Sequence, residues 1–289
     1  MSDVRPRRSA LYVPGANARA LEKAPGLGAD VIVVDLEDAV APAAKEEARA
    51  AAVAAIRRGL GPAEVVLRVN AAGTPWGAAD LAAAAGCGAD AVLLPKVEGP
   101  GELRDAEAAL VAAGAPPGLA LWAMIETPRG VLRVAEIAGA TRRLACLVAG
   151  TSDLVKDLRA RHTPGRAEVL PALSLIVLAA RAHGLAALDG VHLDLADDEG
   201  LARSAAQGRD MGFDGKTLIH PRTVAAANRA FAPGEAELAA ARRIIEAHAA
   251  AVAAGRGVVV VDGRLVEALH VAEAHRVVAL AAAIAARGG

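Results

Sequence analysis

Short apolar runs alternate with longer alanine-rich segments along most of the chain. The runs are apolar on both faces, which is typical of buried strands in a parallel sheet. We interpret eight of them as strands, at residues 9–14, 31–36, 64–70, 91–96, 119–126, 144–149, 185–189 and 216–220. Helical segments lie between them, including residues 41–59, 101–113, 129–139, 166–183 and 197–211. Eight strand–helix units in roughly 220 residues predict an α/β fold of the (β/α)₈ TIM-barrel type.

An open, doubly wound sheet is the structural alternative. That fold often carries a glycine-rich phosphate-binding turn after its first strand. Here the first strand is followed by Pro14-Gly15-Ala16-Asn17, which does not match that fingerprint. The closed barrel is therefore the favoured fold.

The pattern changes near residue 233. Pro233-Gly234 begins a segment that is predicted to be helical to about residue 254, and a last helix is predicted over residues 268–287. Between them, the pair Asp262-Gly263 separates two apolar runs, which is a strong hairpin signal. We therefore predict a barrel over residues 1–232 and a small helix–hairpin–helix lid or oligomerisation segment over residues 233–289.

Composition argues against several classes of protein. The net charge of −1 and the aromatic content of 2% argue against a nucleic-acid partner. No uninterrupted apolar run reaches membrane-spanning length, and no apolar signal core follows the first residues. Cys87 and Cys146 form neither a disulfide framework nor a zinc pattern. We expect a cytoplasmic protein with neither a nucleic-acid nor a membrane partner.

Polar residues end most of the predicted strands, and the carboxyl ends of barrel strands carry the active site. They are Asp35, Glu37, Asp38, Arg68, Asn70, Lys96, Glu126, Asp153, Asp189 and His220. Several carboxylates on one rim repel one another unless a positive charge lies among them. The candidates for that positive charge are Arg68, Lys96 and a bound divalent cation.

Glu126 and Asp153 are the favoured metal ligands, because they follow neighbouring strands. Two carboxylates, with water and substrate as the other ligands, describe a Mg²⁺ site. The alternative is that each carboxylate pairs with an arginine or caps a helix.

Arg68 interrupts an apolar strand and is predicted to point into the barrel mouth. There a guanidinium can bind a carboxylate through two parallel hydrogen bonds. A structural ion pair with Glu37 or Asp38 fits the spacing equally well. Lys96 is a conceivable Schiff-base nucleophile, but neighbouring carboxylates would raise its pKa, so we interpret it as a charged, electrostatic residue.

Several motifs, which occur in order along essentially the whole chain, carry a family resemblance. They are Leu11-Tyr-Val-Pro-Gly-Ala-Asn17, Asp35-Leu-Glu-Asp-Ala-Val40 with Lys45 and Ala48-Arg49, Leu67-Arg-Val-Asn70, Leu94-Pro-Lys96, Ile125-Glu-Thr-Pro-Arg129, Gly150-Thr-Ser-Asp-Leu154 and Gly212-Phe-Asp-Gly-Lys-Thr-Leu-Ile-His-Pro221. The chain resembles the citrate lyase β-subunit-like proteins of the HpcH/HpaI aldolase superfamily.

The resemblance implies a Mg²⁺-dependent lyase that makes or breaks a carbon–carbon bond in a malyl, citramalyl or citryl thioester. The thioester is one of CoA or of an acyl carrier, and the products are an acetyl or propionyl thioester and a 2-oxo acid. The resemblance implies that Glu126 and Asp153 bind the metal and that Arg68 holds the carboxylate of the substrate or the 2-oxo acid. Glu37 and Asp38 would order metal-bound water and support Arg68.

Beside Arg68, we predict that Asn70 and Lys96 bind substrate. The resemblance also implies a homotrimer or hexamer whose C-terminal segment covers the neighbouring site. Lyase members carry an acid/base aspartate after the hairpin, and Glu267 holds that position here. This departure keeps two alternatives open: a malyl-CoA-type thioesterase and a non-catalytic paralogue that binds an acyl thioester.

Overall fold

The computed structural model describes residues 4–287, and the chain divides into two compact units. One unit is Arg7–Phe231. The other contains the residues from 232 onward together with the segment before Arg7.

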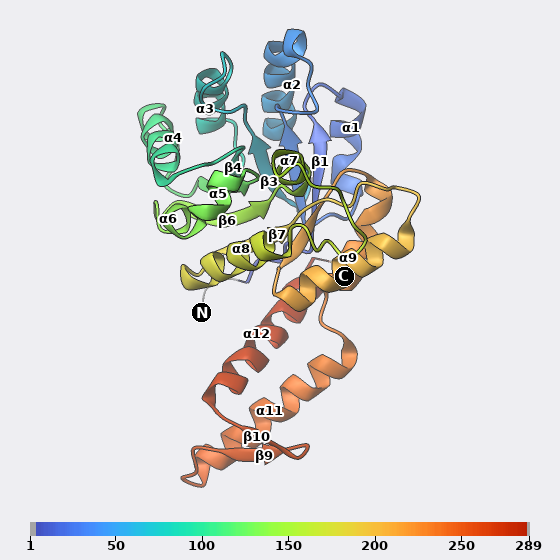
Figure 1. Cartoon of the computed structure of the whole chain (residues 1–289). Helices are drawn as coiled ribbons and strands as arrows, with labels where there is room; N and C mark the ends of the chain where they lie inside the picture. Colours follow the sequence, from blue (N-terminus) through green and yellow to red (C-terminus); the bar gives the residue numbers. More distant parts are fainter. Residues whose placement is uncertain (1–3, 288–289) are drawn as a thin grey trace. The chain divides into compact units, whose positions relative to one another are not determined.

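Eight parallel strands of the first unit form a closed barrel in sequential order, with helices around it (Figure 1). They are β1 (Ser9–Pro14), β2 (Val31–Asp35), β3 (Glu64–Arg68), β4 (Ala91–Leu94), β5 (Ala120–Ile125), β6 (Leu144–Ala149), β7 (Ala186–Asp189) and β8 (Gly215–Leu218). The predicted (β/α)₈ barrel is confirmed. Several predicted strands extend too far, because their last polar residues belong to the loops that follow.

The helices of this unit account for the alanine-rich segments. They are α1 (Ala18–Lys23), α2 (Lys45–Arg58), α3 (Gly77–Ala85), α4 (Pro100–Ala112), α5 (Pro128–Leu132), α6 (Val134–Ala138), α7 (Thr151–Asp157), α8 (Leu170–Ala182), α9 (Asp198–Met211) and α10 (Val224–Phe231). The helical segment predicted over residues 129–139 is present but is divided into α5 and α6. The backbone leaves the helical region at Arg133, with φ −114° and ψ 13°, and two short helices result.

Strand alternation sorts the core into two layers. Inward-facing residues such as Val33, Val66 and Met124 fill the barrel, while the opposite strand faces pack against the helices. Each of these three residues is followed two positions later by a polar residue, namely Asp35, Arg68 and Glu126. Because successive side chains of a strand alternate between faces, the same alternation carries these polar groups to the barrel mouth.

A buried ionic cluster lies at β7 and β8. The Lys216 ammonium donates to Asp189 Oδ2 at 2.8 Å, and both side chains are 0% exposed. Arg166, from the loop before α8, donates to both oxygens of the same carboxylate at 2.7 Å. Gly208 of α9 makes room for the cluster, since a Cβ there would lie 2.7 Å from Asp189 Oδ2. The Asp189 carboxylate thus pairs with two cations, Arg166 and Lys216, between the sheet and the surrounding helices.

The second unit contains the predicted helix–hairpin–helix. Helices α11 (Glu235–Ala253) and α12 (Ala268–Ala285) pack together through small and β-branched side chains such as Ala241, Ala274 and Val277. The antiparallel strands β9 (Val259–Val261) and β10 (Arg264–Val266) are joined by Asp262-Gly263. Both turn residues have positive φ, 49° and 76°, as a two-residue type I′ hairpin requires.

By length and composition alone, α12 is apolar enough to cross a membrane, with a mean hydropathy of 1.4. The sequence prediction did not anticipate this. The helix carries an ion pair between Glu273 and Arg276 and packs along α11. These features favour a helix of a two-helix layer over a membrane span.

Candidate active site

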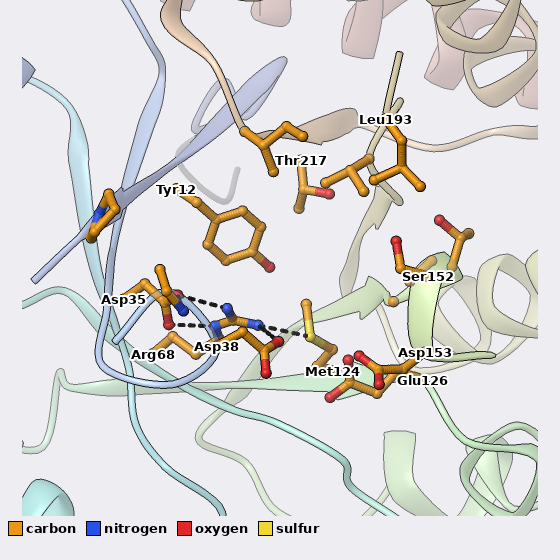
Figure 2. A pocket seen from close by; sticks show the side chains of 17 residues that line it. Tyr12, Asp35, Asp38, Arg68, Met124, Glu126, Ser152, Asp153, Leu193 and Thr217 are labelled. Carbon is orange, nitrogen blue, oxygen red and sulfur yellow. Dashed lines mark hydrogen bonds and ion pairs between the residues drawn. The ribbon is translucent and has the colours of Figure 1, made fainter. Parts of the chain in front are cut away.

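A cavity of about 340 Å³ lies at the carboxyl ends of the barrel strands (Figure 2). Its polar side chains come from β1, β2, β3 and β8, the loops after β2 and β5, and the start of α7. They are Tyr12, Asp35, Asp38, Arg68, Glu126, Thr151, Ser152, Asp153 and Thr217. Leu193 and Ile219 are among its apolar residues. Five of the ten predicted strand-end residues therefore line one concave site of the size of a small-molecule pocket, namely Asp35, Asp38, Arg68, Glu126 and Asp153.

Asp35 is the principal partner of Arg68. Its two carboxylate oxygens accept from Arg68 Nε and Nη2, both at 2.7 Å, across paired positions of β2 and β3. Arg68 Nη1 also lies 3.0 Å from Glu37 and 3.4 Å from Asp38, so the structural ion pair foreseen from the spacing is present. Burial opposes the charge of Arg68, but the hydrogen bonds to Asp35 hold its pKa well above the usual value.

Nη1 is the atom of Arg68 that faces Met124, away from the bidentate pair (Figure 2). The Tyr12 ring lies 4.7 Å from the guanidinium carbon. Tyr12 Oη is buried and has no hydrogen-bond partner among the described residues. Arg68 and Tyr12 therefore present polar groups to the cavity that a bound ligand can satisfy.

Lys96 connects two of the carboxylates. Its backbone has φ 51°, and its N–H donates to Glu126 Oε1 at 2.7 Å. Its ammonium donates to Glu37 Oε1. Burial lowers the pKa of Lys96, but the hydrogen bond to Glu37 and the negative charges of the nearby carboxylates together raise it above the usual value. A Schiff-base lysine needs the opposite shift, so the geometry supports an electrostatic Lys96.

Glu126 is 2% exposed at the end of β5. Burial raises its pKa to about 7; the negative charges of Glu37 and Asp153 act in the same direction, and Lys96 opposes them. Gly150 is necessary for this arrangement, because a Cβ there would lie 2.3 Å from Glu126 Cβ. Gly150 begins the motif Gly150-Thr-Ser-Asp-Leu154, but its packing role was not predicted; its position directly after a buried strand was the available signal.

Glu126 and Asp153 fit a magnesium ion. No group of three or more His, Cys, Asp or Glu side chains is placed to hold a metal within residues 4–287. Magnesium does not need such a cage, since one or two carboxylates with water and substrate oxygens are its usual ligands in enzymes. Both carboxylates line the cavity, and the charge of Asp153 reaches Glu126. A cation there would favour the ionised form of Glu126 against both its burial and its repulsion by Asp153.

Four predicted site residues are not among those that line the cavity, namely Glu37, Asn70, Lys96 and Glu267. Glu37 contacts Arg68, and Lys96 contacts Glu37, so both are joined to a residue of the cavity. Asn70, predicted to bind substrate, is not among the residues that line the cavity. Its amide is 3% exposed and bonds to Lys45, Asp80 and the Leu36 carbonyl. Strand β3 ends at Arg68, so alternation no longer directs the side chain two residues later. Glu267 lies at the start of α12 in the second unit, where it is exposed, and its acid/base role stays a prediction.

The fold and this cavity define a (β/α)₈ barrel protein with an arginine and a carboxylate pair at its catalytic face. Residues 8–221 match the model of the HpcH/HpaI aldolase/citrate lyase family, and the chain belongs to that family.

Relatives with known names extend the comparison. The chain is 50% identical over 282 residues to a (3S)-malyl-CoA thioesterase of Cereibacter sphaeroides, covering 97% of this chain and 96% of the relative. It is 39% identical over 269 residues to the citrate lyase subunit beta of Escherichia coli, covering 91% and 89%. The crystal structure of CitE from Mycobacterium tuberculosis in complex with magnesium, acetoacetate and coenzyme A superimposes with a TM-score of 0.78, 33% identity and coverage of 96% and 100%.

The affinity for Mg²⁺ is expected to depend on pH. A cation binds the ionised carboxylate, and the pKa of Glu126 in the folded protein is about 7. Below pH 7 the affinity should therefore fall by about tenfold per pH unit, and above it the affinity should level off. Isothermal titration calorimetry with MgCl₂ between pH 5.5 and 8.5 measures this. An affinity that is constant from pH 6 to 8 would contradict the assignment.

Proposed function

We propose that the protein is a Mg²⁺-dependent lyase acting on a 3-hydroxyacyl thioester that carries a free carboxylate, of the malyl-, citramalyl- or citryl-CoA type. The reaction, in the cleavage direction, gives a 2-oxo acid and an acetyl or propionyl thioester. The observation that carries the proposal is the cavity that brings Arg68 together with Glu126 and Asp153. The relatives named as a malyl-CoA thioesterase and a citrate lyase subunit support the same substrate class.

In this proposal Arg68 binds the carboxylate of the part that leaves as the 2-oxo acid. Asp35 holds two of its nitrogens, so the guanidinium is fixed before substrate arrives. Glu126 and Asp153 hold the metal, which supplies Lewis acidity toward the developing negative charge on oxygen. Arg68 and Lys96, which both contact the Glu37 carboxylate, would add positive charge to the site, and such charge is most effective where water is excluded.

Glu267 is the proposed acid that protonates the enolate carbon of the departing acyl thioester. Glutamate provides the same functional group as the aspartate of lyase relatives, displaced by one methylene. We also propose a cytoplasmic homo-oligomer. Light scattering on the purified protein tests the oligomeric state.

Thioester hydrolysis is the second candidate function. The relative of Cereibacter sphaeroides, at 50% identity, is named a (3S)-malyl-CoA thioesterase, which favours it. A thioesterase site would have to bind the hydroxy-acid end of the substrate in the same way. The difference is the bond that breaks: carbon–carbon in the lyase and carbon–sulfur in the thioesterase.

The test is product release from malyl-, citramalyl- and citryl-CoA, with Mg²⁺ and with EDTA. We expect one member of the panel to release a 2-oxo acid in the presence of Mg²⁺, and EDTA to abolish that release. Release of free malate and CoA without glyoxylate would establish the thioesterase instead. Cleavage at the full rate in EDTA would refute the metal-dependent mechanism, and binding without any turnover would support a non-catalytic paralogue.

A further inference from the structure

The first residue of α2, Lys45, has a buried ammonium beneath the active-site loop. The side chain is 6% exposed, although lysine is seldom buried without a carboxylate partner. Its three donors go to three acceptors: the Leu36 carbonyl at 2.8 Å, the Glu37 carbonyl at 2.7 Å and Asn70 Oδ1 at 2.7 Å. An ammonium has three N–H groups, so its hydrogen-bonding capacity is fully used.

Two of these acceptors flank one residue. The carbonyls of Leu36 and Glu37 belong to the peptide units on either side of the Glu37 Cα. The Glu37 N–H is held separately, by Asp35 Oδ1 at 2.8 Å. The backbone of Glu37 is therefore fixed from both sides. Its carboxylate contacts Arg68, which lines the cavity, and Lys96.

We propose that Lys45 is the positioning residue for Glu37 and, through Glu37, for the cations Arg68 and Lys96. This inference rests on the proposed function only in its kinetic test. Lys45 does not line the cavity and touches no reacting atom. It acts by fixing the direction in which the Glu37 side chain leaves the loop after β2.

The rest of the cluster anchors Lys45 and provides a control. Asn70 donates to Asp80 Oδ2 at 2.6 Å, and Asp80 Oδ1 accepts from Arg49 at 2.6 Å. Arg49 lies one turn after Lys45 on α2 and belongs to the same cluster, but it makes no contact with the loop 36–40 among the described hydrogen bonds and ion pairs. Loss of either cation costs stability, whereas only loss of Lys45 frees the backbone of Glu37.

The experiment compares Lys45→Met with Arg49→Met. Thermal unfolding and the kinetics of the thioester assay are measured for both. We expect both melting temperatures to fall, kcat to drop about 10²-fold only in Lys45→Met, and Arg49→Met to keep kcat within about threefold. Lys45→Ala should regain activity with propylammonium, which replaces the atoms beyond Cβ, and not with 1-propanol, which has the same length and no charge.

Crystal structures of the two variants separate this proposal from the proposed function. In the Lys45→Met structure we expect the ion pair between Glu37 and Lys96 to be broken. In the Arg49→Met structure we expect this ion pair to be retained. An unmoved Glu37 in Lys45→Met would overturn the positioning role, as would equal kcat losses in both variants. If the wild type turns over none of the thioesters, the proposed function fails, and the position of Glu37 in the two structures alone decides the role of Lys45.

Discussion

Replacement of Glu126 by glutamine is expected to abolish Mg²⁺-dependent turnover while making the metal-free protein more stable. The activity should fall by about 10³-fold or more, because a Lewis-acid cation supplies several kcal/mol of transition-state stabilisation. Glutamine keeps an oxygen that can accept from the Lys96 N–H, so the local geometry should survive. Product release and Mg²⁺ titration measure the loss.

The gain in stability follows from the pKa of Glu126. Its ordinary value is 4.5, and in the folded protein burial raises it to about 7. The unfolded chain therefore releases this proton at a lower pH than the folded chain, and ionisation costs folding free energy. The cost is absent below pH 4.5, grows up to pH 7 and is constant above it, at about 3 kcal/mol. Glu126→Gln removes this cost.

Urea denaturation of the metal-free protein at pH 5 and pH 8 tests whether ionisation of Glu126 lowers the free energy of unfolding. The free energy of unfolding of Glu126→Gln should exceed that of the wild type by a larger margin at pH 8 than at pH 5. Glu136→Gln is a matched control, because Glu136 is an exposed glutamate paired with Arg133 on the barrel surface and should change neither turnover nor Mg²⁺ affinity. A Glu126→Gln enzyme that retains more than a tenth of wild-type turnover would contradict the ligand assignment.

The barrel could be predicted from the sequence because its strands are buried on both faces and separated by helical segments. The same logic located Arg68 and Glu126, since each continues the alternation of a strand whose inward residues are apolar. It failed at Asn70, because alternation applies only while the strand lasts and β3 ends at Arg68. Nothing in the local pattern signals that Asn70 faces Lys45 and Asp80, which are distant in sequence.

The ion-pair partners of the site residues were harder to predict than the strand ends on which those residues lie. Several carboxylates near one rim left the partner of Arg68 open between Glu37 and Asp38. The structure gives the bidentate contact to Asp35, since strand register sets it opposite Arg68. Register depends on how β2 and β3 align, which the pattern within one strand does not specify. The roles of Lys45 and Gly150 likewise arise from contacts between separate segments.

Loss of the Asp189 carboxylate is expected to destabilise the barrel strongly. Asp189→Leu leaves the Lys216 ammonium, which is 0% exposed, without its carboxylate, and removes both bonds to Arg166. Breaking a buried ion pair from one side costs about 3–5 kcal/mol, because an uncompensated charge stays in the interior. Burial already lowers the pKa of Lys216 even with Asp189 present. Equilibrium urea denaturation measures the loss.

The double variant Asp189→Leu/Lys216→Met separates the cost of the stranded charge from that of lost packing. Replacing both partners by apolar groups of similar volume leaves no unpaired lysine, so most of the stability should return, although Arg166 still lacks its partner. Arg166 is 12% exposed in its side chain and also bonds to Gln207, so water and that amide can satisfy it in part. A double variant as unstable as Asp189→Leu would show that the carboxylate acts through Arg166 and the loop before α8, and that Lys216 contributes little to the loss.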